Sequence, residues 1–292
     1  MVYFLSILTS VFIAVMIAIN GNLTAVYGVP AATVIIHLIG LVVMTAVAAF
    51  RKERLFSVRE LPLSLLSGGA VGVATTLFNN MAFGRISVSA IIALSLLGQA
   101  ITSLVIDQYG FFGMPVRKFN SGKLAGLLFT LFGIVCLLLD SNFVFLPVIL
   151  SFLTGISIVV SRTINAALAE RTSVMVSSWY NFAVGLAVAL LILVLAGGLP
   201  ALPAIPVSRW WIYLGSVLGI GVVLLSNITT PRMPSFQLTL ILFAGQVFTG
   251  IVLDAIFARG FSTQSLIGGV LVTIGLSLNL WLDYRTGQPS ET

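Results

Sequence analysis

The residues best suited to chemistry in this chain are two glutamines that lie within long apolar stretches. Each follows a glycine and precedes an aspartate by eight residues, in the sets Gly98-Gln99 with Asp107 and Gly245-Gln246 with Asp254. A side-chain amide both donates and accepts hydrogen bonds. In a membrane it can therefore hold a polar solute, or it can tie two helices together.

The two sets stand 147 residues apart (246 minus 99), and other residues recur at almost the same displacement. These pairs, 147 or 145 residues apart, are Asn80 with Asn227, Asn20 with Asn165, and Gly40 with Gly185. We predict that the chain consists of two tandem copies of one unit, at 1–142 and 143–292, which together form one integrated domain.

Composition predicts a membrane protein. Of the 292 residues, 59% are hydrophobic and 8% are charged, and the mean hydropathy is +1.16. A soluble domain carries about 25% charged residues. We attribute the net charge of +6 to basic cytoplasmic loops and expect no nucleic-acid binding. The single cysteine, Cys136, excludes an intramolecular disulfide, and the first apolar segment lacks the signals of a cleaved leader peptide.

Charges and Pro/Gly clusters divide the chain into ten apolar segments. They lie at 2–25, 31–50, 61–83, 88–106, 124–139, 143–168, 174–196, 210–230, 236–257 and 264–282. A span needs ~20 apolar residues, and spans without an alternating barrel pattern must be helices. The predicted fold is therefore all-α, with ten transmembrane helices in two five-helix repeats. Because five is odd, the second repeat is inverted, which is a common plan of secondary transporters that work by alternating access.

Basic residues predict the orientation in the membrane. If the amino terminus is inside, the inner loops hold ten of them: Arg51, Lys52, Arg54, Arg59, Arg117, Lys118, Lys123, Arg171, Arg232 and Arg285. The outer loops then hold Arg85, Arg209 and Arg259. Because cytoplasmic loops are enriched in Lys and Arg, we predict a multi-pass protein of the cytoplasmic (inner) membrane with both termini in the cytoplasm.

Depth along the segments makes both glutamines candidates for a central cavity. At 1.5 Å per residue they lie roughly 15–18 Å into their helices, near the midplane of a hydrocarbon core ~30 Å thick. Gln99 and Gln246 could line a substrate cavity, and bonding between helices is the alternative. His37, the only histidine, could relay protons, or it could be a neutral side chain bonded within the bundle. Phe182 stands at its place in the second repeat, and both proton coupling and facilitated diffusion stay open.

Amides and aromatic residues near the ends of the segments are further candidates for substrate contact. The asparagines are Asn20, Asn80, Asn165 and Asn227. Their alternative role is helix capping or the bonding of a gate. Tyr180 and Asn181 belong to a polar and aromatic start of the seventh segment. This start could form a wall beside the substrate, or it could mark the membrane interface.

Three charged residues are candidates for gating or ion pairing. Asp107 and Asp254 end helices at opposite faces, where a carboxylate opposes the helix dipole. Basic residues nearby, such as Arg117 and Arg259, could compensate this charge, and a solvated loop carboxylate is the alternative. Arg162 lies inside an apolar segment, where we expect it to snorkel towards the cytoplasmic face. It could instead pair with Glu170 or bind an anionic substrate group.

Residues that are missing narrow the function. No Asp or Glu lies near the midplane of any segment, and the sequence contains neither a P-loop nor a metal cluster or nucleophile–base set. We therefore predict no enzymatic activity and no cofactor. The predicted function is a secondary transporter of a small organic metabolite or drug-like solute. A flippase for lipid-linked molecules and a membrane scaffold component are the alternatives.

The stretch Leu97-Gly-Gln-Ala-Ile-Thr-Ser-Leu-Val-Ile-Asp107, together with Ile19-Asn-Gly-Asn-Leu23, resembles the YdcZ-type branch of the drug/metabolite transporter superfamily. This resemblance covers nearly the whole chain and implies an inner-membrane exporter with a central cavity. It also implies that helices one to four and six to nine line the cavity. Helices five and ten would then lie at the periphery, where a homodimer could form. The second half keeps Gly245-Gln246 but has Asn165-Ala166 where the first half has Asn20-Gly21.

Overall fold

The computed structural model describes residues 1–53, 55, 62–82, 85–86, 88–117, 128, 131–132, 144–198 and 207–256, with isolated positions between 267 and 281. These residues form eight α-helices: α1 (Val2–Tyr27), α2 (Val29–Arg51), α3 (Gly68–Ala82), α4 (Val88–Tyr109), α6 (Phe145–Arg171), α7 (Val174–Leu195), α8 (Leu214–Thr229) and α9 (Ser235–Ile256). Short 3₁₀ turns adjoin them: η1 (Leu63–Leu66), η2 (Phe111–Gly113), η4 (Val207–Tyr213) and η5 (Thr230–Arg232).

Eight of the ten expected segments correspond to these helices, and for seven of them the bounds differ by a few residues at most. The third segment differs most, since its first residues form η1 and the α-helix begins only at Gly68. Within the described ranges, five helical stretches are long and apolar enough to cross a membrane. Segments 124–139 and 264–282, and with them the expected homodimer contact, fall almost wholly outside the described residues.

Local sequence explains the sharp turn between the first two helices. Gly28 has a φ of +75° and its N–H donates to the Thr24 carbonyl at 2.8 Å, which ends α1. Pro30 lies in the first turn of α2, where its missing N–H costs no helical hydrogen bond. A glycine able to adopt positive φ, followed by a proline, therefore reverses the chain in a single residue.

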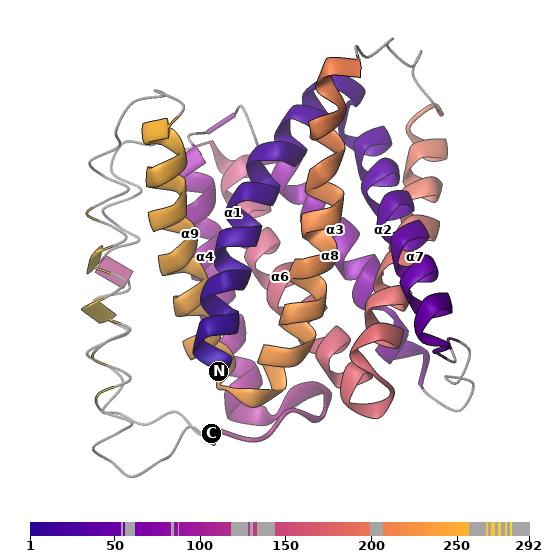
Figure 1. Cartoon of the computed structure of the whole chain (residues 1–292). Helices are drawn as coiled ribbons and strands as arrows, with labels where there is room; N and C mark the ends of the chain where they lie inside the picture. The colour runs from indigo at the N-terminus through magenta and orange to yellow at the C-terminus, as the bar shows by residue number, and fades with distance from the viewer. Residues whose placement is uncertain are drawn as a thin grey trace.

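The eight helices contact one another in a cyclic order. Starting from α1, the neighbours are α8, α2, α7, α3, α6, α4 and α9, and α9 packs against α1 again. Figure 1 shows α9 and α4 at one side of the bundle, α2 and α7 at the other, and α1 between them. Every neighbour pair in this order joins a helix from residues 1–142 to a helix from residues 143–292.

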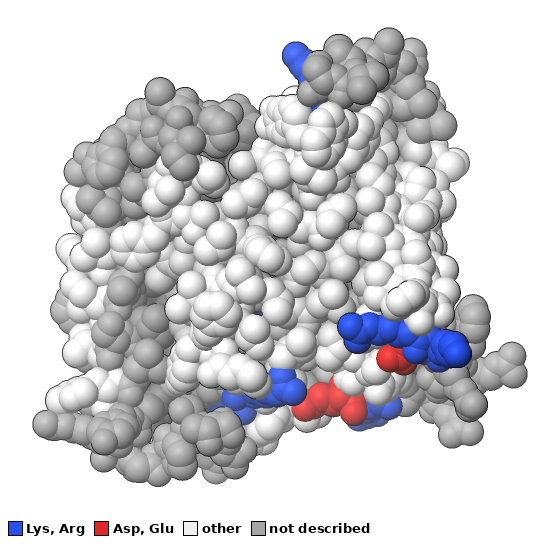
Figure 2. All heavy atoms as spheres, in the orientation of Figure 1, with Lys and Arg blue, Asp and Glu red and all other residues white. Residues whose placement is uncertain are grey.

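Charged side chains gather at one end of the bundle, along the lower edge of Figure 2. We call this the charged end. There α2 ends at Arg51, α6 ends at Arg171 and η5 ends at Arg232, and the amino terminus lies at the same end. The opposite end carries η4 with the exposed Arg209. The asymmetry agrees in direction with the basic residues counted along the sequence.

Glycines let α2 and α7 approach closely at two matching places. A Cβ at Gly185 would overlap the His37 ring, and a Cβ at Gly40 would overlap the Phe182 ring. Gly185 corresponds to Gly40, and Phe182 to His37, each at a displacement of 145 residues. In each contact, a glycine of one half thus faces the ring of the other half, and the second contact repeats the first with the two halves interchanged.

The contacts of two asparagines repeat in the same reciprocal way. The side chain of Asn165 occupies the space beside Gly68, and that of Asn20 occupies the space beside Gly215. The first contact joins α6 to α3, and the second joins α1 to α8. Small residues at such contacts are what helices need in order to pack closely in a membrane.

Candidate functional site

Buried amides and hydroxyls join three helices near the charged end. We call this group the asparagine cluster: Asn165, Ser177, Ser178, Asn181 and Asn227, all of which are buried. Asn165 Nδ2 donates to Asn181 Oδ1 at 2.8 Å, and the Ser177 hydroxyl donates to the Asn165 carbonyl at 2.5 Å. Asn227 Nδ2 lies within 3.2 Å of the Ser177 hydroxyl and 3.1 Å of the Ser178 hydroxyl. The cluster ties α6, α7 and α8 together.

A tight hairpin brings these side chains together. Only Thr172 and Ser173 separate α6 from α7, and the Ser173 hydroxyl caps α7 by accepting from the N–H of Val176 at 3.1 Å. Asn165 and Asn181 then stand at similar distances from the turn on facing helices. The cluster also extends towards α3, because Ser161 donates to the Gly68 carbonyl at 2.7 Å.

A second polar group lies where α4, α6 and α9 meet. We call it the Arg162 junction: Arg162, Ser103, Thr239 and Asp107. Arg162 Nη2 donates to Thr239 Oγ1 at 3.0 Å, and the Thr239 and Ser103 hydroxyls lie 2.8 Å apart. Arg162 is 6% exposed, and its Nε and Nη1 have no hydrogen-bond partner among the described residues.

The expectation that Arg162 snorkels to the cytoplasmic face is wrong, because the side chain is buried and bonded to α9. It does not pair with Glu170 either. Eight residues of helix separate the two by roughly 12 Å along the axis, and Glu170 is exposed at the end of α6. The guanidinium therefore keeps its charge inside the bundle.

Asp107 caps the start of α9. Its Oδ1 accepts from the N–H of Ser235 at 2.8 Å, and its Oδ2 accepts from the N–H of Phe236 at 3.0 Å. The hydrogen-bonded partner is thus a helix N-terminus and not the basic side chain that we expected, although Arg117 lies close enough to act through space. A helix N-terminus has free N–H groups and a partial positive charge. Asp254 has a side chain outside the described part of the chain.

The two glutamines share no hydrogen bond in the described part of the chain. Gln99 Nε2 donates to Ser95 Oγ at 3.3 Å within α4, and Gln246 makes no hydrogen bond to the described residues. Both are only partly buried. Besides the polar groups of the Arg162 junction, the contact between α4 and α9 contains an apolar cluster of Leu96, Ala100, Phe236, Leu240 and Phe243.

His37 is packed in the contact between α2 and α7. Its Nδ1 lies 2.8 Å from the Thr33 carbonyl oxygen, and since a carbonyl only accepts, this nitrogen carries the proton. The ring meets Phe182 edge-on, with centroids 6.1 Å apart. The side chain is buried, so its visible contacts are those of a packed, hydrogen-bonded histidine.

The remaining candidates are spread through the bundle. Asn20 Oδ1 is buried against Gly215 with no hydrogen-bond partner among the described residues. Tyr180 is half-buried and stacks edge-on against Trp179, at 5.0 Å between centroids. The side chain of Asn80 lies outside the described residues. Of the sequence candidates, the structure therefore unites Asn165, Asn181 and Asn227, and separately Asp107 with Arg162.

Sequence reasoning missed Ser103 and Thr239. Ser103 stands four residues after Gln99 and four before Asp107, which places the three along one side of α4. That spacing could have identified Ser103. Thr239 had no such signal, because its role depends on α9 packing beside α4.

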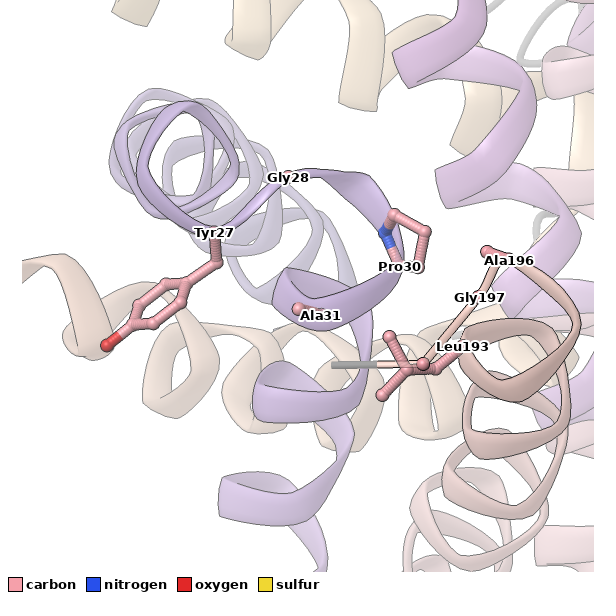
Figure 3. Close-up of a pocket in the computed structure, with 8 residues that line it drawn as sticks. Tyr27, Gly28, Pro30, Ala31, Leu193, Ala196 and Gly197 are labelled. Atoms are coloured by element: carbon pink, nitrogen blue, oxygen red, sulfur yellow. The ribbon is translucent and has the colours of Figure 1, made fainter. Parts of the chain in front are cut away.

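A pocket of about 370 Å³ lies at the end opposite to the charges. Pro30 and Ala31 line one side, and Leu193 and Ala196 line the other, while the Tyr27 ring points away (Figure 3). The lining contains no charged side chain, so nothing in the pocket would orient a charged solute. Within the described residues, no group of three His, Cys, Asp or Glu side chains could hold a metal ion.

Comparison with known proteins gives both a fold and a family. One solved structure, described as "Crystal structure of protein", aligns with a TM-score of 0.70 over 98% of this chain and 97% of its own, at 19% identity. No curated protein matches the chain. The family described as "Putative inner membrane exporter, YdcZ" matches residues 1–136 and 146–278. The apolar helices fit a multi-pass protein of the inner membrane, and the chain belongs to the YdcZ family of drug/metabolite transporters.

Proposed function

We propose that this protein is a secondary transporter that moves a small organic solute across the inner membrane by alternating access. We further propose that the chain contains ten helices in two inverted five-helix repeats, at 1–142 and 143–292. The observation that carries the proposal is the exchange symmetry of the contacts. When each helix number n is exchanged for n+5, α1–α8 becomes α6–α3, α1–α9 becomes α6–α4, and α2–α8 becomes α7–α3.

The directions of the helices support inversion of the repeats. Helix α1 begins at the charged end, whereas its counterpart α6 ends there at Arg171. The reciprocal contacts of His37 with Gly185, and of Phe182 with Gly40, support the same arrangement. Two halves that make the same contacts in opposite directions can exchange conformations, which opens one face of the membrane and then the other.

The asparagine cluster is our candidate for the gate at the charged end. Positions 32 and 36 in the first half, which correspond to Ser177 and Asn181, hold Ala32 and Ile36. At the end of the bundle opposite to the charges, the matching position is therefore part of an apolar cluster that contains Leu23 and Ala32. Interhelical hydrogen bonds in membranes are worth about 0.6–2 kcal/mol each. Such bonds are strong enough to favour a closed end and weak enough to be broken in a transport cycle.

Facilitated diffusion fits the surroundings of His37 better than proton coupling. The Nδ1 proton is engaged by a carbonyl of the same helix, and the ring fills the space left by Gly185. A proton carrier needs a route to water, whereas this side chain is buried. We therefore propose that His37 supports the α2–α7 contact and that the solute's own gradient drives the flux.

Counterflow in proteoliposomes tests the function. Thermal-shift screening first selects metabolites that bind the folded protein, because such ligands raise the apparent stability. Vesicles preloaded with a selected metabolite should then accumulate the labelled form transiently. If no selected metabolite shows counterflow and labelled lipid is scrambled instead, the protein is a flippase.

Cysteine labelling tests the proposed orientation. In a Cys136→Ala background, Arg171→Cys at the charged end and Arg209→Cys at the opposite end are a matched pair, since both side chains are exposed. An impermeant reagent added to whole cells should modify residue 209 and spare residue 171. Labelling of residue 171 from outside would reverse the orientation.

A further inference from the structure

The Arg162 guanidinium is an incompletely paired charge inside the bundle. An arginine offers five N–H donors, and here one nitrogen is bonded, to the neutral Thr239 hydroxyl. Nε and Nη1 are buried without a hydrogen-bond partner among the described residues. Burial of a charge is unfavourable unless it is paired and hydrogen-bonded. The rest of the structure therefore has to offset a substantial cost at this position.

The carboxylate nearby does not remove the charge. Asp107 acts on Arg162 through space, but the described residues contain no Arg162–Asp107 contact short enough for an ion pair. Both Asp107 oxygens are engaged by the first N–H groups of α9. Asp107 lies between the C-terminus of α4 and the N-terminus of α9, whose opposite partial charges offset each other, and Arg117 acts on the same carboxylate through space. The junction thus keeps buried guanidinium donors without a partner among the described residues, which suits an anion.

Packing alone does not require an arginine here. The counterpart of Arg162, 145 residues earlier, is Ile17, which is 50% exposed. The close helix contacts near this position are alike in both halves. Gly155 packs against α4, and Ser10, which stands 145 residues earlier, packs against Gly245 of α9. A chain that keeps an unfavourable residue in only one of two matching places usually does so for function.

We propose that Arg162 binds the acidic group of the transported solute, so that the solute is an organic anion with a carboxylate or phosphate group. The inference rests on the transport function proposed above. Guanidinium groups bind carboxylates and phosphates through two parallel hydrogen bonds. Nη2 carries a second N–H besides the one that it donates to Thr239, and this N–H forms a parallel pair of donors with either Nε or Nη1, neither of which has a partner among the described residues. The Thr239 hydroxyl lies beside the guanidinium and is bonded to the Ser103 hydroxyl, so that one of the two hydroxyls keeps a proton that it can donate to the same anion.

Access to Arg162 depends on the asparagine cluster. Ser161 precedes Arg162, and Asn165 follows it by less than one helical turn. Ser161 is bonded to α3, and Asn165 is bonded to α7. When these bonds break, this turn of α6 separates from its neighbours and the guanidinium becomes accessible to solute from the charged end.

Thermal unfolding of the purified full-length protein tests the proposal. The probes are the sodium salts of benzoate, succinate, glucose 6-phosphate and inorganic phosphate, each compared with sodium chloride at equal ionic strength. We expect at least one anion to raise the Tm by about 5 °C at a hundredfold excess over its Kd. The rise should vanish in Arg162→Gln, shrink in Arg162→Lys, and persist in Arg171→Gln, which removes an exposed charge from the same helix. Comparison of the Tm rise with the two carboxylates and the rise with the two phosphates shows which acidic group the protein prefers.

Three results would overturn the inference: no anion-specific rise in the wild-type protein, an unchanged rise in Arg162→Gln, or a fall of more than ~5 °C in the Tm of ligand-free Arg162→Gln. The last would make the arginine a structural residue. Counterflow of a neutral solute that survives Arg162→Gln would also overturn it, yet would leave transport established. An anion effect lost in Arg162→Gln, without counterflow of any solute, would support the site and contradict the transporter.

Discussion

The reciprocal contacts between α2 and α7 predict that two glycines are equally intolerant of a methyl group. A Cβ at Gly185 would lie 2.6 Å from His37 Nε2, and a Cβ at Gly40 would lie 2.8 Å from Phe182 Cγ, with still closer approaches to the same rings. Either ring must move, and overpacking of this kind costs about 1–3 kcal/mol. For a protein of this size, the Tm should fall by roughly 2–4 °C for each kcal/mol.

A double-mutant cycle separates this clash from other effects of the substitution. His37→Ala removes the ring that obstructs Gly185→Ala, so the double variant should lose less stability than the sum of the single losses. We expect a coupling of about 1–2 kcal/mol, within the range seen for contacting residues. Thermal unfolding in detergent, followed by tryptophan fluorescence, measures each variant. Gly21→Ala is the control, because its Cβ would meet nothing within 4 Å and alanine favours a helix by about 1 kcal/mol.

Two results would refute this reasoning. If Gly185→Ala and His37→Ala add to within ~0.5 kcal/mol, the two residues do not touch in the folded protein. If Gly185→Ala is costly while Gly40→Ala is neutral, the contact is real but the halves are not exchanged about a common axis. The second result would remove the main support for inverted repeats.

Three further predictions concern the polar groups. Asp107→Asn should lower stability by about 1–3 kcal/mol, because one charge-assisted hydrogen bond to α9 is lost; an unchanged Tm would mean that the cap is absent. Asn227→Ala should speed the modification of a cysteine placed at Ser161 in a Cys136→Ala background, because the cluster at the charged end loses its link to α8; an equal rate would argue against a gate. Gln99→Ala and Gln246→Ala should each reduce counterflow more than the yield of folded protein, and parallel losses would favour a structural role.

The helices could be predicted from the sequence because their signals are local. Apolar length and breakers such as Gly28 and Pro30 define where a span begins and ends, and the bounds of seven expected segments agree with the structure to within a few residues. The third helix was less predictable, since an apolar run does not reveal that residues near Pro62 form a 3₁₀ turn before Gly68.

The candidate site was harder to predict because its partners are distant in sequence. Asp107 meets amides 128 and 129 residues further on, so a search for a basic partner nearby looked in the wrong place. Arg162 was expected at the membrane surface because long cationic side chains commonly reach it. Its burial depends on Thr239 of α9, which no pattern along α6 reveals. The asparagines of the cluster were identified, but their mutual bonding required the α6–α7 hairpin.

The cyclic order of contacts has a consequence for how the protein is made. Each helix takes both neighbours from the other half of the chain, so α1 to α4 enter the membrane before any of these partners has been synthesised. Contacts of such large sequence separation form late, after a considerable loss of chain entropy. During that interval polar groups such as Asn20 and Asp107 lack the surroundings that they have in the finished bundle. The ring of helices therefore closes only when both halves are present, and biogenesis depends on the early helices being shielded from degradation until the late ones arrive.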